Sequence, residues 1–219
     1  MSGLFTFISP LMKQFRVSRA RRIKRFFPDI DNRSIADVSG SLHFWSFVRS
    51  EIKPKQVVIY NIALDRQFNP DNVGREPDNI QATVYDGQHI PVNDKQIDIL
   101  ICNSVIEHVP PPDRAGLARE IKRVARNYVI QTPAKEFPVE LHFLMPFLHW
   151  LPRPIGRVLA KISPFGLVER DAMVTRQLFD ETNLLSAREF RRLFPEGHFV
   201  TERFLFLPKS YLIINKAAT

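Results

Sequence analysis

The chain has 219 residues and a formal net charge of +8, from 31 basic and 23 acidic side chains. With 44% hydrophobic residues and 18 Phe, it is too apolar for a disordered protein and long enough to bury one large core. Its single cysteine excludes a disulfide framework and a cysteine-rich zinc site. One cysteine also fits a reducing compartment, so we expect a cytoplasmic protein.

The basic charge is concentrated at the N-terminus. Residues 1–27 contain seven basic and no acidic side chains, which leaves 24 basic and 23 acidic residues, a net +1, for residues 28–219. We therefore divide the chain into a basic extension or leading helix at 1–27 and a near-neutral domain at 28–219. No stretch reaches the ~18–20 apolar residues of a membrane-spanning helix.

Short apolar runs alternate with helical patterns along the domain. The run 56–62 is largely apolar and β-branched, which is typical of a strand buried on both faces. Ser186 and Glu189 form a capping-box pattern, and Pro208-Lys209 is expected to turn a closing β-hairpin. In chain order, the expected strands are 34–38, 56–62, 80–85, 97–102, 127–131, 199–207 and 210–215, and the expected helices are 42–52, 112–126 and 186–193.

This alternation predicts an α/β fold, namely a Rossmann-like, mostly parallel, seven-stranded sheet with helices on both faces and a C-terminal β-hairpin. Residues 133–172 are rich in Pro and aromatic residues and are expected to form an insertion. Cys102 falls inside an expected strand and should be a core residue. In such sheets, ligands bind at the carboxyl ends of the strands, near the point where the strand order reverses.

Motifs follow the third and fourth expected strands. The first runs Asp86-Gly87-Gln-His-Ile-Pro, and the second runs Ile97-Asp-Ile-Leu-Ile-Cys-Asn-Ser-Val-Ile-Glu-His-Val109, followed by Glu120-Ile-Lys-Arg-Val. Over residues 34–133 they resemble the small type-11-like class I S-adenosylmethionine-dependent methyltransferases. The pattern of that group is D-x-x-x-L-P-F, F-D-x-V-x-x-x-x-V-x-E-H-V and E-x-x-R-V-x-K. Residues 138–152 also resemble the P-x-E-x-H…P-F-x-H-W-x-P segment of some members.

The resemblance implies S-adenosylmethionine as the cofactor and gives roles to residues at the strand ends. Asp86 would accept a hydrogen bond from the adenine amino group, and Gly87, which has no side chain, would let the adenine ring lie close to the backbone. Asn61 stands where the family usually has an acid that holds the ribose hydroxyls. The implied cofactor-binding residues are Asp37, Gly40, Asn61, Asp86, Gly87, Asn103 and Ser104, of which the last two would line the floor beneath the methionine end.

The loop after the first strand departs from the family pattern. It has a single glycine, Gly40, between Ser39 and Ser41, where the family usually has two or three glycines. A residue with a Cβ costs roughly 1–2 kcal/mol at a left-handed position, and its side chain could fill cofactor volume. Two alternatives follow from the sequence. One is an active methyltransferase of a small acceptor, and the other is a catalytically inactive, methyltransferase-like binding or scaffold protein.

Methyl transfer needs in-line alignment and a base for an acceptor O–H or N–H group, but no covalent nucleophile on the protein. His108 and His142 are the candidate bases. The alternative is that they are structural residues of the loop after the fourth strand and of the insertion. The pairs Glu107/His108 and Glu140/His142 are of a kind that is common in proteins, so the sequence predicts no metal site.

Two segments bear on the partner. Residues 12–27 mix Phe and Ile with basic residues, which predicts either a helix over the cofactor pocket or attachment to an anionic membrane. In the second case residues 1–27 would form the contact, with contributions from Leu4, Phe5, Phe7 and Leu11. The segment 143–166 has apolar side chains and three cations without an acid. It would roof a pocket for an apolar substrate, enter a membrane interface or cap the core. A basic stretch alone is poor evidence for nucleic-acid binding, so we expect a small-molecule acceptor, either lipid-linked or a saccharide.

Overall fold

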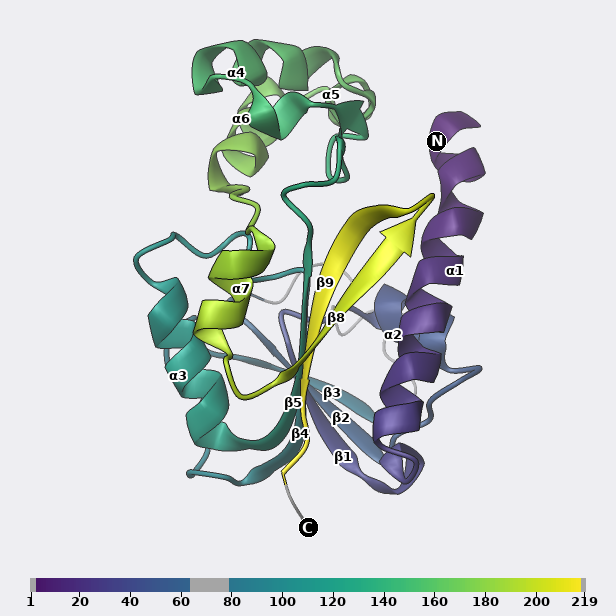
Figure 1. The fold of residues 1–219 in the computed structure, drawn as a ribbon, viewed down its shortest axis with the longest axis vertical. Helices are drawn as coiled ribbons and strands as arrows, with labels where there is room; N and C mark the ends of the chain where they lie inside the picture. Colours follow the sequence, from purple (N-terminus) through teal and green to yellow (C-terminus); the bar gives the residue numbers. More distant parts are fainter. Residues whose placement is uncertain (1–2, 64–78, 218–219) are drawn as a thin grey trace.

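The computed structural model describes residues 3–63 and 79–217, with side chains from Met12 onward. Seven strands form one sheet in the order β3-β2-β1-β4-β5-β9-β8 (Figure 1). The strands from β3 to β5 are parallel, whereas β9 runs antiparallel to both β5 and β8. This topology confirms the predicted fold class. The strands are β1 (Ser34–Val38), β2 (Gln56–Asn61), β3 (Ile80–Val84), β4 (Ile97–Asn103), β5 (Ala125–Pro133), β8 (His198–Phe204) and β9 (Leu207–Asn215).

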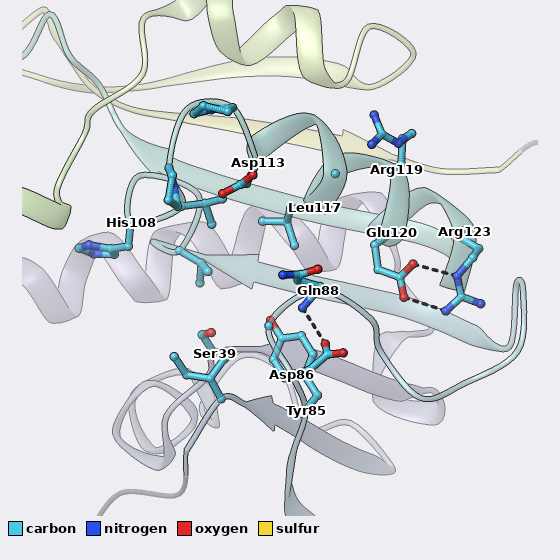
Figure 2. A pocket seen from close by; sticks show the side chains of 17 residues that line it. Ser39, Tyr85, Asp86, Gln88, His108, Asp113, Leu117, Arg119, Glu120 and Arg123 are labelled. Atoms are coloured by element: carbon cyan, nitrogen blue, oxygen red, sulfur yellow. Dashed lines mark hydrogen bonds and ion pairs between the residues drawn. The ribbon is translucent and has the colours of Figure 1, made fainter.

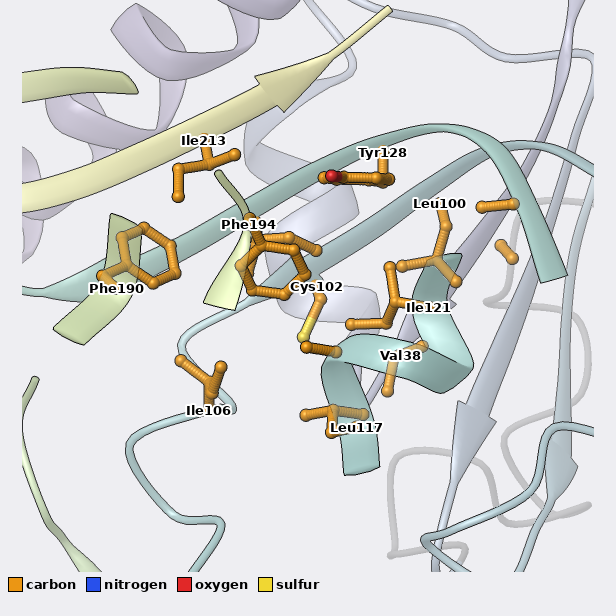
Figure 3. Packing of buried hydrophobic residues seen from close by; sticks show 14 of the residues in the cluster. Val38, Leu100, Cys102, Ile106, Leu117, Ile121, Tyr128, Phe190, Phe194 and Ile213 are labelled. Atoms are coloured by element: carbon orange, nitrogen blue, oxygen red, sulfur yellow. The ribbon is translucent and has the colours of Figure 1, made fainter. Parts of the chain in front are cut away.

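Helices cover both faces of the sheet (Figure 1). α1 (Gly3–Phe26) and α2 (Leu42–Val48) lie on one face, and α3 (Arg114–Val124) and α7 (Ala187–Leu193) lie on the other. Alternation along β4 explains the two cores, because Ile99 and Ile101 pack on the α1 side while Leu100 and Cys102 pack on the α3 side. Cys102 is fully buried in this second core, as expected (Figure 3).

The basic N-terminal segment forms a 24-residue helix that takes part in the core. Ala20, Ile23 and Phe27 are each 1% exposed and pack with Trp45 of α2. Burying such side chains stabilises the fold by about 1.5–3 kcal/mol for each large one. The C-terminal half of α1 is therefore integral to the folded domain.

The insertion builds a helical cap at one end of the molecule (Figure 1). Phe143, Leu148, Ala160 and Phe179 form its small core. Its last helix, α6, was not expected from the sequence. The elements are β6 (Val139–Glu140), β7 (Met145–Pro146), η4 (Leu148–Trp150), α4 (Arg153–Ile162), α5 (Pro164–Glu169) and α6 (Ala172–Glu181).

Two predicted boundaries are wrong. The helix expected over 42–52 ends at Val48, and the hairpin turns at Leu205 and Phe206 instead of Pro208-Lys209. Both turn residues have positive φ, +46° and +71°, as in a type I′ turn. A type I′ turn favours Asn-Gly at these two positions, so the apolar pair Leu205-Phe206 did not indicate a turn in the sequence. The capping box at Ser186 is confirmed.

Candidate functional site

Two cavities open at the carboxyl ends of the parallel strands. The larger, here called the α3 cavity, has a volume of about 780 Å³ and is lined by the ends of β1 and β3 and by α3 (Figure 2). The second, here called the α1 cavity, has a volume of about 420 Å³ and is lined by α1 and the ends of β4 and β5. His108 lines the α3 cavity and His142 lines the α1 cavity. Their ring centroids are 4.9 Å apart, so the cavities meet at these imidazoles.

Asp86 and Gly87 follow β3 on the wall of the α3 cavity. Asp86 is labelled in Figure 2. Asp86 Oδ1 accepts backbone hydrogen bonds from His89 at 2.6 Å and from Gln88 at 2.8 Å. These donors hold the pKa of the exposed Asp86 carboxyl below its usual value, so it is ionised at neutral pH. Gly87 has a φ of +81°, and a Cβ there would lie 3.1 Å from Ile62 Cγ2. The backbone at this position therefore requires glycine.

The loop between β1 and α2 contains one strained residue and one close contact. Ser39 has a φ of +54° and lines the α3 cavity. Gly40 lies so close to Asp37 that a Cβ on it would be 2.0 Å from Asp37 Oδ2. Ser41 caps α2, accepting a hydrogen bond from the Phe44 backbone at 3.2 Å. The loop's glycine is thus required for packing, while a serine occupies the left-handed position.

Asp37 and Asn61 both contact Gly40 of the β1–α2 loop. The Asp37 carboxylate is 1% exposed and its Oδ2 accepts a hydrogen bond from Trp45 Nε1 at 2.8 Å. Its Oδ1 has no partner among the described residues. Burial raises the pKa of Asp37 to about 7. Asn61 donates from Nδ2 to the Gly40 carbonyl oxygen at 3.4 Å. Neither residue lines the two cavities.

Asn103 and Ser104 line the α1 cavity beside a buried arginine of α1. Arg19 Nη1 donates hydrogen bonds to Asn103 Oδ1 and, at 3.0 Å, to Gln131 Oε1. The same guanidinium forms a 2.6 Å ion pair with Glu202 of β8. Ser104 Oγ donates to Gln131 Oε1 at 2.9 Å. This polar network fixes the cavity floor and ties α1 to the C-terminal hairpin.

Most of the α1 cavity wall is apolar. Phe15 of α1 meets Phe204 of β8 edge to face, with 5.8 Å between ring centroids. Lys209 Nζ lies 4.2 Å from the centre of the Phe15 ring, and burial lowers the pKa of Lys209 to about 8. The apolar lining residues are Met12, Phe15, Phe44, Phe137, Val139, Leu141, Leu144 and Phe204.

The two imidazoles differ in basicity. Burial lowers the pKa of His108 to about 4, so this ring is neutral at physiological pH. His142 Nδ1 lies 2.7 Å from Glu140 Oε1. Burial alone lowers the pKa of His142, but the hydrogen bond and negative charge of Glu140 outweigh burial and raise it overall. The structure thus brings the two predicted histidines together.

Sequence reasoning did not place Arg19, Gln131 or Lys209 at the site. Arg19 and Glu202 are separated by 183 residues, so no local pattern could pair them. The one available signal was the acid-free, aromatic character of residues 12–27, which predicted a helix over a pocket among its alternatives.

The model of a methyltransferase-domain family matches residues 42–128. This range starts at α2 and ends within β5. No curated protein sequence matches the chain.

Solved methyltransferase structures share the fold at low sequence identity. Magnesium protoporphyrin IX methyltransferase from Synechocystis PCC 6803, solved with bound SAH, superposes with a TM-score of 0.60 at 10% identity over 100% of this chain and 89% of its own. An S-adenosylmethionine-dependent methyltransferase from Aquifex aeolicus has a TM-score of 0.55 at 13% identity, over 95% of this chain and 96% of its own.

A third structure is 1,6-didemethyltoxoflavin-N1-methyltransferase from Burkholderia thailandensis, solved with 1,6-didemethyltoxoflavin and S-adenosylhomocysteine. Its TM-score is 0.54 at 10% identity, over 91% of this chain and 76% of its own. Sequence identities this low show only that the fold is shared. The family match is independent of them, because it is a match in sequence over residues 42–128. The chain therefore has the fold of these methyltransferases, and its residues 42–128 match the methyltransferase-domain family.

Proposed function

We propose that the chain transfers a methyl group from S-adenosylmethionine to a small acceptor. The observation that carries the proposal is the α3 cavity, where the ionised Asp86 stands beside Gly87 at the strand ends. The carboxylate can accept the adenine amino group, and the bare glycine lets the ring approach the backbone. The residues present therefore fit the adenosine part of the cofactor. Two of the structures with this fold were solved with S-adenosylhomocysteine or SAH bound.

The other predicted contacts follow from this placement. The methionine end would extend toward the α1 cavity, above Asn103 and Ser104. Asn61 would reach the ribose from the end of β2 if its side chain turned from the Gly40 carbonyl toward the α3 cavity, and Gly40 would lie beside the amino-acid moiety. Asp37 supports that loop from inside and is a positioning residue in this proposal.

The α1 cavity is the proposed acceptor site. Its apolar lining favours an acceptor with a hydrocarbon part over a free saccharide, so we assign it a lipid-linked small molecule. The bound cofactor supplies an electrophilic methyl group, and this chain must orient the acceptor and take up its proton. His108 and His142, where the two cavities meet, are the residues we assign to that proton.

Isothermal titration of the full chain with S-adenosylhomocysteine tests the cofactor site. We expect saturable binding with a stoichiometry near one, and weaker binding in Asp86→Ala because the adenine amino group loses its acceptor. Asp29→Ala is the matched control, since this exposed acid and its partner Arg33 lie outside both cavities. A folded protein without binding would favour the inactive scaffold alternative, and an unchanged affinity in Asp86→Ala would refute the placement of adenine.

We further propose that the protein is cytoplasmic and attaches to an anionic membrane surface. Among the residues whose side chains are described, thirteen of the fifteen exposed large apolar ones belong to α1, to the insertion with α6, or to the hairpin tip. Figure 1 places the cap of α4–α6, the start of α1 and the hairpin tip at the same end of the molecule. Phe206 at the tip is 91% exposed. Such a concentration of apolar surface marks a binding face.

Cations flank these apolar side chains. Lys13 on α1, Lys161 on α4 and Arg203 beside the hairpin tip are all exposed. Each basic residue near an anionic bilayer contributes about 1 kcal/mol to attachment. The predicted contributions of Leu4, Phe5, Phe7 and Leu11 lie outside the described side chains. No described helix combines the length and apolarity needed to cross a membrane.

The membrane proposal is tested on the full chain, because deleting residues 1–27 would remove core side chains of α1. Leu205→Asn/Phe206→Gly gives the turn its favoured residues and removes two exposed apolar side chains. We expect this variant to keep its stability and to sediment less with vesicles of phosphatidylcholine and phosphatidylglycerol. Val84→Thr removes an exposed apolar residue on β3 and should bind as the parent does. Equal sedimentation of all three proteins would refute the proposed face.

A further inference from the structure

Glu107, His108 and His142 converge where the two cavities meet. Glu107 and His108 come from the loop after β4, and His142 follows β6. Each offers one potential ligand atom, and these three atoms lie within 4.8 Å of one another. The imidazole rings are nearly perpendicular, at 77°. A metal ion bound to three such donors at about 2.0–2.2 Å would draw them together by small side-chain movements.

The Glu107 carboxylate is incompletely satisfied in the structure. Its side chain is fully buried, and Oε2 accepts a 3.0 Å hydrogen bond from Thr132 Oγ1. Oε1 has no partner among the described residues, although it is shielded from solvent. Leaving a buried acceptor unpaired is unfavourable by about 1–3 kcal/mol, and more for a charged group. A cation at Oε1 would remove this penalty.

A second buried carboxylate lies behind His142. Glu140 is 1% exposed, and its Oε2 accepts a hydrogen bond from the Phe143 backbone at 2.8 Å. Neither Glu107 nor Glu140 forms an ion pair with a lysine or arginine of the described chain. Two buried acids without a lysine or arginine ion pair form a region that a divalent cation would neutralise.

The arrangement around His142 also suits a metal ligand. Its Nδ1 lies 2.7 Å from Glu140 Oε1, which leaves Nε2 as the nitrogen with a free lone pair. A carboxylate behind a ligating histidine fixes the ring's tautomer and orientation in metal sites. Three independent features therefore meet in one small region. They are the unpaired oxygen of Glu107, the adjacent imidazoles of His108 and His142, and the Glu140 carboxylate bonded to His142.

We propose that Glu107, His108 and His142 form a site for a divalent transition metal, with Zn²⁺ as the ion best suited to two imidazoles and one carboxylate. Three protein ligands leave at least one coordination position open, as in catalytic zinc sites. The site lies between the α3 and α1 cavities, where an acceptor oxygen could fill that position.

If the proposed methyl transfer holds, this site defines the acceptor more closely. A hydroxyl bound to the metal would ionise more readily, and its proton would pass to solvent. With the metal bound, the two imidazoles would act as ligands, so the proton-accepting role assigned to them above would apply only to the metal-free site. The acceptor oxygen then forms a bond to the methyl carbon while the carbon–sulfur bond breaks, and S-adenosylhomocysteine leaves. The acceptor would be a hydroxyl compound, not an amine.

Metal binding is measured on the full chain after removal of any affinity tag and dialysis against EDTA. Calorimetric titration with ZnCl₂ should show one equivalent of Zn²⁺ per chain, and Co²⁺ should give visible absorption bands of a nitrogen- and oxygen-ligated ion. Glu107→Gln and His142→Ala should abolish this binding. Glu140→Gln should weaken it about 10–100-fold, as for residues that support a metal ligand. His89→Ala, which removes an exposed histidine, should bind as the parent does.

The outcomes separate this site from the proposed function. Circular dichroism and thermal unfolding check each variant, and His108→Gln replaces any that fails to fold. Absence of stoichiometric Zn²⁺ binding, or binding unchanged by all ligand substitutions, overturns the metal site. S-adenosylhomocysteine is titrated into the same metal-free sample, so its binding without Zn²⁺ binding rejects the metal site alone. Zn²⁺ binding without cofactor binding keeps the metal site and rejects the proposed methyl transfer.

Discussion

Ser39→Gly tests the strain in the β1–α2 loop and its effect on the cofactor site. Ser39 has a φ of +54°, in the left-handed region, and its side chain faces the α3 cavity. A residue with a Cβ is disfavoured there by about 1–2 kcal/mol. Glycine relieves that strain but loses about 0.5–1 kcal/mol more backbone entropy on folding. The net gain in the free energy of unfolding is therefore expected to be about 1 kcal/mol.

A gain of this size should raise the Tm by about 2–4 °C for a chain of this length. The Ser39 hydroxyl also hydrogen-bonds to Tyr85, and both residues line the cavity, where water can replace the lost partner. Differential scanning calorimetry measures the stability, and titration with S-adenosylhomocysteine measures the affinity. We expect affinity at least equal to that of the parent, because the glycine gives the cofactor more room beside the loop.

Ser39→Ala is the matched control. It removes the hydroxyl but keeps the Cβ at the same positive φ, so it should give no gain in Tm. Ser41→Gly is a second control, since Ser41 has an extended backbone and glycine at an N-cap is unfavourable by only a few tenths of a kcal/mol. A lower Tm for Ser39→Gly than for Ser39→Ala would refute the strain argument.

Two further substitutions test buried charges. Arg19→Met leaves Glu202 buried without its ion-pair partner and should lower the free energy of urea unfolding by about 3–5 kcal/mol, with partial recovery in Arg19→Met/Glu202→Gln. A loss under about 0.5 kcal/mol would mean that α1 is a separable tail. Asp37→Asn keeps an acceptor for Trp45 Nε1 but cannot ionise. Because the native Asp37 pKa is about 7 against 3.8 unfolded, the native state binds the proton more tightly. The free energy of unfolding of the parent should therefore fall by at most about 4 kcal/mol as the pH rises from about 4 to 7. Above about pH 7 this contribution should no longer change with pH. Parallel pH curves of both proteins would contradict this assignment.

Elements whose signals are local in the sequence were predictable. The apolar run of β2, the motif at Asp86 and Gly87, and the capping box at Ser186 each depend on neighbouring residues, and the structure has each element near its expected position. The turn at Leu205 and Phe206 was missed because it uses residues that type I′ turns disfavour, so no local preference indicated it.

Side-chain orientation at the site was less predictable than position. The resemblance placed Asp37 near the cofactor, but it could not show that the carboxylate lies under Gly40 and bonds to Trp45. That direction depends on how α2 packs against β1. Its role as a cofactor contact stays a prediction. The network of Arg19 joins α1, β4, β5 and β8, so it exists only once the whole sheet is assembled.

The basic charge of residues 1–27 has a different meaning in the folded chain. Arg19, Arg21 and Lys24 pair with Glu202, Glu51 and Asp31, so three of the seven basic side chains are balanced by acids elsewhere in the sequence. The charge excess alone is therefore a weak argument for a membrane, and the apolar end of the molecule is the stronger one. Because α1 forms one wall of the α1 cavity and also reaches that end, a lipid-linked acceptor would enter along the same helix that would meet the bilayer (Figure 1).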